Sequence, residues 1–341
     1  MRTEKREVRK MKEIKKMLKK AAALTAAVSV AMFAFSGCSS KQDVYKVGVT
    51  QIADHPSLDN CREGFIEGLK EDGIVEGENL ELDFQSAQND IKMASQIAQN
   101  FASTGKNLVC GISTPSAQAL YTACYEKGIP VVFNAISDPI EAKLVKEDGS
   151  AMDGVTGVSD ALPVEDQLKL IREILPDAKK IGILYTTSEP NSVSTLRIYK
   201  DLAPQYGFEI VEKGIGTAAE VAQGAEILAS SVDCISNMTD NNVVAALSVV
   251  LEKANANKIP VFGSEEEQVG NGCLASAGLD YYQLGIQAGK MAARILKGEK
   301  PSDIPYETLK ESKITFNIAT AQSLGIELPQ SVLDAGQDKQ N

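Results

Sequence analysis

The sequence predicts an α/β protein made of two similar Rossmann-like lobes, each with a parallel sheet covered by helices, joined by a hinge. From residue 44 onward, short apolar runs of strand length alternate with helical segments, a pattern typical of parallel strands buried on both faces. A helix end, an Ile-Pro-Val strand and a polar turn occur at residues 127–133 and again at 257–263. Such a repeat at domain scale indicates two related halves.

The first half is expected to start with a strand at 44–50 and a helix at 56–71, in which Leu58, Cys61 and Phe65 lie near helical spacing. The same alternation predicts the following elements: strand 80–84, helix 91–102, strand 108–112, helix 116–126, strand 129–133 and a bridging strand at 154–160. Crossovers between such parallel strands are right-handed almost without exception.

The pattern then starts again. It predicts helix 163–175, strand 181–186, helix 191–206, strand 208–211, helix 217–230, strand 232–236, helix 243–256, strand 259–262, strand 273–280, helix 281–297, a last strand within 308–318 and a short helix at 319–325. The polar tail 328–341 is expected to fray. Because late segments should return to the first half, we expect one lobe from 38–159 with 277–312 and another from 160–276 with 313–341.

Composition narrows the function. The chain has 341 residues, 43% of them hydrophobic, which favours two domains with real cores. The net charge is −11 although the first 20 residues are strongly basic, so the remainder is more acidic still. An acidic body without Trp is a poor partner for nucleic acid.

The N-terminus is typical of an export signal. Basic residues precede the uncharged, mostly apolar segment 21–36, which is short for a membrane span and fits the core of a secretory signal. The segment ends in Phe35-Ser36-Gly37-Cys38. This resembles a bacterial lipobox, with Phe35 in place of the usual Leu, and implies a signal peptide at 1–37 and lipid attachment at Cys38. The alternative is a plain signal peptide with an unrelated Cys.

Signals for an enzyme are weak. None of the six Cys pairs at C-x-x-C spacing, and we interpret Cys110, Cys234 and Cys273 as core residues. His55 is the only His, so triad chemistry would have to pass through it, and no nucleophile, phosphate-loop or zinc motif occurs. The acidic run 265–267 is interpreted as the solvated start of a helix. We therefore expect no catalytic residue, no metal and no cofactor.

Signals for ligand binding are stronger, because polar turns follow several predicted strands, where ligands bind in open α/β sheets. Thr114 and Ser116 open one helix and could hold a carboxylate, or they could simply cap it. Asn191 and Ser192 open another helix in the same way. Asp240 could accept a ligand ammonium, or it could be an N-cap. The further candidates at strand ends are Ser137, Asp138, Thr239, Ser264 and, in an early turn, His55.

Several motifs, in order, resemble the ABC-transporter substrate-binding proteins of the tryptophan/tyrosine type. They are His55-Pro56-Ser57-Leu58-Asp59, Thr114-Pro115-Ser116-Ala117-Gln118-Ala119, Ser137-Asp138-Pro139, Thr156-Gly157-Val158-Ser159-Asp160, Pro190-Asn191-Ser192 and Gly278-Leu279-Asp280-Tyr281. The resemblance covers about 44–328. It departs at 237–241, which usually reads Pro-Thr-Asp-Asn, and at 263–266, where this chain has Glu and Asp is common.

The resemblance implies a type I periplasmic-binding-protein fold and a monomeric, extracytoplasmic lipoprotein, anchored to the membrane at Cys38, that delivers its ligand to an ABC permease and its ATPase. It implies an amino acid ligand, aromatic by family habit, lying among the cleft candidates named above. We expect its carboxylate near Thr114 to Ser116 and Asn191-Ser192, its ammonium at Asp240, and its side chain against His55 or Tyr185. The alternatives are a ligand-sensing ectodomain, or a different small polar solute; a regulator's effector domain is disfavoured by the export signal.

Overall fold

The computed structural model describes residues 10–13, 15–17, 44–309 and 311–339. Contacts divide the chain into a unit at 1–43 and a compact unit from Val44 to Asn341. Residues 10–13 and 15–17 of the first unit are helical. Cys38 and the rest of the expected signal segment at 18–37 lie outside the described residues. Within the described ranges, no helix has both the length and the apolar content that crossing a membrane requires.

The first lobe is built on a six-stranded sheet of order β11-β5-β4-β3-β1-β2, in which every pair is parallel. Its elements are β1 (Tyr45–Gln51), α2 (Pro56–Glu71), β2 (Leu80–Ser86), α3 (Ile91–Ser103), β3 (Leu108–Ile112), α4 (Thr114–Cys124), η1 (Tyr125–Lys127), β4 (Val131–Asn134), β5 (Val155–Ser159), α11 (Tyr281–Leu296), η4 (Pro301–Asp303) and β11 (Glu307–Thr308).

The second lobe has a parallel sheet of order β7-β6-β8-β9. Its first elements are α5 (Val164–Ile174), β6 (Lys180–Thr186), α6 (Pro190–Leu202), η2 (Ala203–Tyr206), β7 (Glu209–Ile215), η3 (Ala218–Glu220), α7 (Val221–Ala229), β8 (Cys234–Ser236), α8 (Asn241–Ala245), α9 (Leu247–Ala256), β9 (Val261–Phe262) and α10 (Glu266–Gly270).

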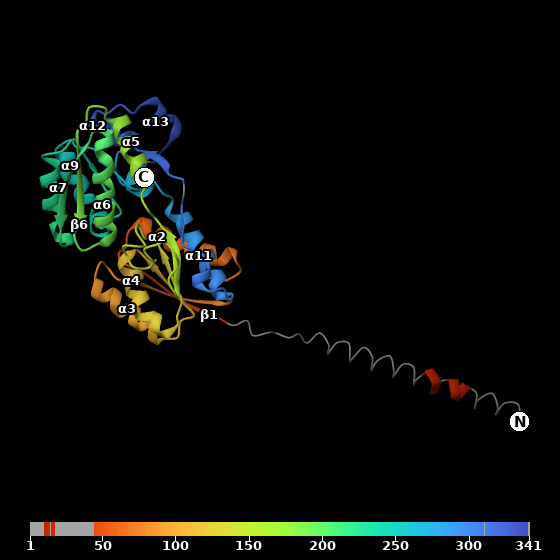
Figure 1. Cartoon of the computed structure of the whole chain (residues 1–341). Helices are drawn as coiled ribbons and strands as arrows, with labels where there is room; N and C mark the ends of the chain where they lie inside the picture. The colour runs from red at the N-terminus through yellow and green to blue at the C-terminus, as the bar shows by residue number, and fades with distance from the viewer. Residues whose placement is uncertain (1–9, 14, 18–43, 310, 340–341) are drawn as a thin grey trace, which may run out of the picture. The chain divides into compact units, whose positions relative to one another are not determined.

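A second, mixed sheet of order β10-β12-β13 completes this lobe. Its elements are β10 (Ala275–Gly278), β12 (Lys313–Phe316), α12 (Ile318–Leu324), α13 (Gln330–Ala335) and β13 (Gln337–Asp338). Backbone bonds from Leu274 N to Val261 O (2.7 Å) and from Gly263 N to Ala275 O (3.0 Å) join it to β9. The chain therefore passes between the lobes three times, after β5, after β10 and after β11 (Figure 1).

The strand expected within 308–318 is β12, which begins where the chain returns to the second lobe. Two other details differ from the sequence expectation. The expected lobe boundary at 276/277 falls inside β10, which pairs with β12 as far as Gly278. The tail expected to fray instead forms α13 and β13, held by buried Val332 and by pairing with β12.

Helices α2 and α11 lie far apart in the sequence but pack against each other in the first lobe. Gly64 and Gly68 of α2 face Gly285 and Gly289 of α11, and a methyl group on any of them would meet the backbone of the partner helix. Only glycine permits such close approach of two backbones. The two helices lie side by side in Figure 1, so the starts of both, which carry site residues, are held in fixed relation.

Cysteines fill both cores. Cys61, Cys110, Cys124, Cys234 and Cys273 are buried and free, in line with their interpretation as small apolar core residues. Burial raises the pKa of the thiols of Cys110 and Cys234, so neither is a reactive thiolate.

Candidate functional site

A cavity lies between the lobes at the carboxyl ends of both sheets. It is narrow in this closed state, with room for only about one or two water molecules, and is partly open to solvent. The residues around it are His55, Ser57, Leu58, Ser113, Thr114, Ala135, Ser137, Asp160, Asn191, Thr239, Asn241, Val244, Glu265, Gln268 and Tyr281. They lie in the loops that follow strands and in the helix starts after those loops, where ligands bind in open α/β sheets.

Two turns of the first lobe have an unusual backbone at the cavity. Ser113, directly after β3, has φ 77° and ψ 158°, and Ala135, directly after β4, has φ 57°. Residues other than glycine rarely adopt positive φ, and such strained residues cluster at ligand sites. These turns bring Ser113, Thr114 and Ser137 to the cavity wall.

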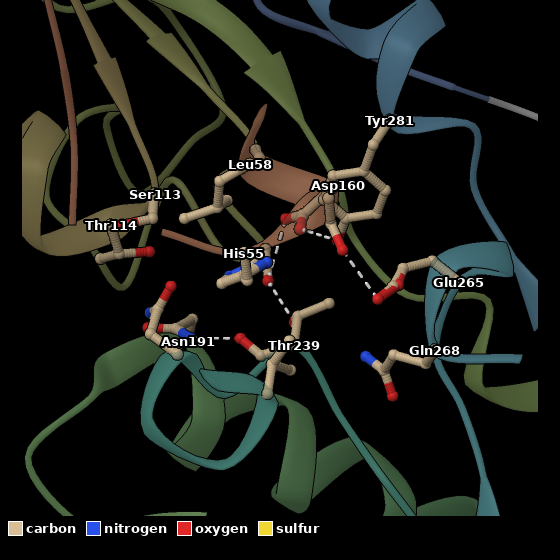
Figure 2. A pocket seen from close by; sticks show the side chains of 15 residues that line it. His55, Leu58, Ser113, Thr114, Asp160, Asn191, Thr239, Glu265, Gln268 and Tyr281 are labelled. Carbon is tan, nitrogen blue, oxygen red and sulfur yellow. Dashed lines mark hydrogen bonds between the residues drawn. The ribbon is translucent and has the colours of Figure 1, made fainter. Parts of the chain in front are cut away.

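One end of the cavity is acidic. Asp160 Oδ1 accepts a hydrogen bond from Ser137 Oγ (2.9 Å), and its Oδ2 accepts one from the Tyr281 hydroxyl (2.6 Å). Burial raises the pKa of the Asp160 carboxyl. Glu265, directly before α10, is 1% exposed, and its Oε1 accepts from Ser57 Oγ (2.8 Å). Figure 2 shows Asp160, Tyr281, Glu265 and Gln268 along this side.

Among the described residues, Glu265 has no cationic partner. Its Oε2 is buried and has no partner with hydrogen-bond geometry there, although the nearby Gln268 side chain lowers the pKa of this carboxyl somewhat. The amide nitrogen of Gln268, next to it, donates to Ser264 Oγ (2.8 Å). Burial, and then the charge of Glu267, raise the pKa of Glu265 to about 8. The titratable groups that act on Glu265 or feel its charge are Asp160, Glu267, Tyr281, Cys61 and Cys273.

The opposite end of the cavity is polar but neutral (Figure 2). Ser113 Oγ and Asn191 Oδ1 are buried and have no partner within the described ranges. Thr114 begins α4 and Asn191 lies in the first turn of α6, so backbone N–H groups and the positive ends of two helix dipoles lie at this end. The helix starts and the Ser113 hydroxyl can donate to an anion. Asn191 Oδ1 can only accept, and Asn191 Nδ2 already donates to the buried carboxylate of Glu189 at 3.2 Å.

His55 lies in the middle of the cavity beside Leu58 (Figure 2). Burial lowers the pKa of its imidazole to about 4, although Asp59 and Asp54 oppose the shift. The ring is therefore neutral at physiological pH, and its Nδ1 has no partner in the described residues. Among the described residues, no Lys or Arg lines the cavity, so its carboxylates have no protein cation beside them.

Hydrogen bonds connect the lobes around the cavity. Ser137 Oγ and Thr239 Oγ1 lie 3.1 Å apart, and Asn89 Nδ2 donates to Asn242 Oδ1 at 3.1 Å. Other side-chain bonds between the lobes are Ser57–Glu265, Asn60–Glu267 and Ser194–Asp138. The lobes are thus closed on each other in this structure.

The structure brings five of the expected site residues to the cavity: His55, Thr114, Ser137, Asn191 and Thr239. Ser137 and Thr239 come from the equivalent polar turns of the two lobes and meet directly. Asp138 lies beside them, where its carboxylate accepts a hydrogen bond from Ser194 of the other lobe. It therefore contributes to closure without lining the cavity.

Asp240 does not line the cavity, contrary to expectation. Its carboxylate is buried and accepts four hydrogen bonds, from Thr186 N (2.6 Å), Thr186 Oγ1 (2.8 Å), Ser192 Oγ (2.7 Å) and Val243 N (3.0 Å). The last bond caps α8. With both oxygens committed inside the second lobe, the alternative of an N-cap holds and the ammonium assignment does not.

Four other expected residues also lie away from the cavity lining. Ser116 is fully buried one turn into α4, and Ser192 is committed to Asp240. Ser264 accepts from Gln268. Tyr185 packs against the core of the second lobe, because its position on β6 directs it to the helix-covered face.

Asp160, Glu265, Gln268 and Tyr281 are lining residues that the sequence reasoning missed. The run at 265–267 was expected to be solvated, yet Glu265 is buried because the closed lobes cover it. The internal repeat could have identified Glu265 as a lining residue. Glu265 lies six residues after Ile259, just as Ala135, another lining residue, lies six residues after Ile129.

Comparison with known proteins places this architecture. Residues 46–339 match the family model described as ABC transporter substrate binding protein. The chain is 42% identical over 281 residues to the "Tyrosine-binding protein" of Clostridioides difficile (strain R20291), covering 82% of this chain and 81% of that one.

Two solved structures also match. The ABC domain of Streptococcus pneumonia in complex with L-Trp is 36% identical, with a TM-score of 0.84 and coverage of 87% of this chain and 100% of that one. A ligand-free, open substrate-binding protein of Clostridium difficile is 41% identical with the same coverage, but its TM-score is 0.67. The likeness is therefore greater to the complex, despite its lower identity.

Proposed function

The chain belongs to the ABC transporter substrate-binding protein family, and on that basis we propose that it captures a free aromatic α-amino acid between its lobes and delivers it to an ABC permease. Proteins of this family are extracytoplasmic, work with ABC transporters and bind their solutes without converting them.

The observation that carries the ligand proposal is the division of the cavity into an acidic end and a neutral, donor-rich end. Asp160 and Glu265 are buried with no Lys or Arg among the lining residues. Two helix starts and the unpaired hydroxyl of Ser113 lie opposite. A zwitterion would place its ammonium at the first end and its carboxylate at the second, which gives each charge a partner in a dry site.

The aromatic side chain is supported by the walls and by the relatives. His55, Leu58, Val244 and Tyr281 supply rings and apolar surface to the cavity, which is the usual lining of a small-molecule site. A tyrosine-binding protein and a protein with bound L-Trp are among the similar chains. We therefore place the ring of the ligand against His55, in the role expected from the sequence.

We further propose that residues 1–37 are removed and that Cys38 carries a lipid anchor. The mature protein would be a monomer that delivers its ligand to a permease and its ATPase. The support for the anchor and the cleavage is the basic, then apolar N-terminal sequence that ends in a Cys, and the support for the permease and ATPase is the family. A Cys38→Ala variant expressed in a bacterial host should leave the membrane fraction and appear in the soluble or secreted fraction. Retention of this variant in the membrane would contradict the anchor.

A thermal-shift screen of the standard amino acids tests the ligand, followed by calorimetry on those that bind. A ligand at 100 times its Kd adds about 2.7 kcal/mol of stability, which raises Tm by several degrees. We expect the aromatic amino acids to give the largest shifts, and N-acetyl-L-tyrosine amide, which has neither charge, to give none. A protein that responds to no amino acid would refute the proposal, whereas a response to another polar solute would redirect it.

A further inference from the structure

We propose that Glu265 is the residue that recognises the ammonium group of the ligand and that makes closure of the cleft depend on it. This inference rests on the proposed function, since it assigns one end of the amino acid to one residue. It also replaces Asp240 in the role expected from the sequence.

The two oxygens of Glu265 have different surroundings. Oε1 accepts from Ser57 Oγ at 2.8 Å, a bond that crosses from the second lobe to the first turn of α2 in the first lobe. Oε2 is buried at the cavity and has no hydrogen-bond partner in the described residues. One carboxylate therefore joins the lobes through one oxygen and offers the other to whatever fills the cavity.

The other acidic group of the lining is already committed. Both oxygens of Asp160 accept hydrogen bonds, from Ser137 and from Tyr281. Glu267 also has a buried Oε2 without a partner in the described residues, but it does not line the cavity. Glu265 Oε2 is thus the carboxylate oxygen of the described cavity lining with an open position, and an ammonium group carries the donors and the charge that it lacks.

Closure and recognition are linked because closure buries Glu265. A buried carboxylate with an unpaired oxygen is strongly unfavourable unless a cation or a proton offsets its charge. A ligand with an ammonium supplies the cation, so the lobes can close on it. A ligand without one leaves the charge unpaired, and sites built around a polar partner reject analogues that lack it by large factors.

The experiment compares two ligands that differ only in the amine, L-tyrosine and 3-(4-hydroxyphenyl)propanoate, by calorimetry on the full-length protein. The same measurement on L-tryptophan and 3-indolepropanoate provides a second pair. Glu265→Gln keeps an oxygen that can accept from Ser57 but removes the charge. Glu266→Gln is the matched control, because Glu266 is the neighbouring acid, lies outside the cavity lining and pairs with Lys339 at 3.2 Å.

In the wild type and in Glu266→Gln, loss of the amine should weaken binding by roughly 100-fold or more. In Glu265→Gln the same loss should cost about tenfold or less, because the charged partner is gone. An equal amine penalty in Glu265→Gln and wild type would overturn the inference while leaving the proposed function intact. A wild type that binds neither amino acid would overturn both, so the two failures are distinguishable.

Circular dichroism and melting of each variant show whether it folds. If Glu265→Gln does not fold, a crystal structure of the wild type with the bound amino acid decides the question. The inference requires the ammonium nitrogen within hydrogen-bond distance of Glu265 Oε2. A nitrogen bound by Asp160 or Asp240 with Glu265 left unpaired would overturn it.

Discussion

Replacing Gly68 with alanine tests how closely α2 and α11 approach. A methyl group at this position would collide with the carbonyl oxygen of Ile286 and lie 3.0 Å from Gly289 Cα. Both obstacles belong to the backbone of α11, so no side chain can rotate out of the way. The helices must instead move apart along their contact.

The size of the effect follows from this geometry. Forcing a methylene-sized group into a packed interface costs about 1–3 kcal/mol, and a gap of roughly 0.5–1 Å along the rest of the contact forfeits a quarter to a half of the dispersion energy of the facing atoms. Against this, alanine is better than glycine in a helix by up to about 1 kcal/mol. The net expectation for Gly68→Ala is a loss of about 2 kcal/mol of unfolding free energy, or roughly 4–8 °C in Tm.

Denaturant unfolding and thermal melting measure this loss, with Gly182→Ala as the matched control. A methyl group on Gly182 would lie 3.1 Å from Val232 Cγ2 and 3.4 Å from Leu228 Cδ2, which are the ends of side chains. These can yield, so the control should change stability by less than about 1 kcal/mol. If Gly68→Ala is as stable as the wild type, α2 and α11 do not meet backbone to backbone, and the reasoning fails.

Three further outcomes are expected. Asp240→Asn should lower the free energy of unfolding by about 2–4 kcal/mol, because an amide keeps one acceptor oxygen for four donors. Its affinity for the ligand should stay near the wild-type value. If the variant is stable but does not bind, Asp240 regains its role as the ammonium partner. Closure of the ligand-free protein, followed by X-ray scattering, should weaken as pH rises. Burial and Glu267 raise the pKa of Glu265 to about 8 from an ordinary 4.5, so in the open state, where the side chain is exposed, the pKa should be near the ordinary value. The protonated acid therefore contributes fully to closure at a pH below about 4.5, and this contribution is lost as the pH rises through about 8. A compactness of the protein that does not depend on pH would contradict this. Finally, dithiothreitol should leave Tm unchanged, since the five cysteines of the described part are free and buried; a lower Tm would reveal a disulfide.

The architecture was predictable because local signals agree with the global fold. Continuous apolar runs became the parallel strands, and the repeat at 129 and 259 became β4 and β9, at equivalent places in the two lobes. The expectation failed at the lobe boundary of 276/277 and at the tail, since β10 and β13 both pair with β12, a partner that lies elsewhere in the sequence.

The site was less predictable because burial there is created by two lobes together. Ser137 and Thr239 lie in polar turns that follow strands, and such a turn reaches the cleft whichever residues of the other lobe pack over it. Glu265 is different, since three acids in a row read as a solvated surface until α2 of the other lobe covers the first of them. For Asp240, the sequence left capping and binding equally open, and only the donors around the carboxylate decide between them.

The return of α11 to α2 also affects how the chain acquires its structure as it emerges from the ribosome. The glycine face of α2 is made early, but the helix that covers it follows the whole of β6 to β10 in the sequence. The N-terminal segment thus cannot finish folding as an independent domain while translation continues, unlike the usual order in which domains fold one after another. The second lobe has most of its own sheet before that point. Its remaining strands, β12 and β13, follow α11 and β11 in the sequence, so we expect neither half to reach its native packing until nearly the whole chain has been made.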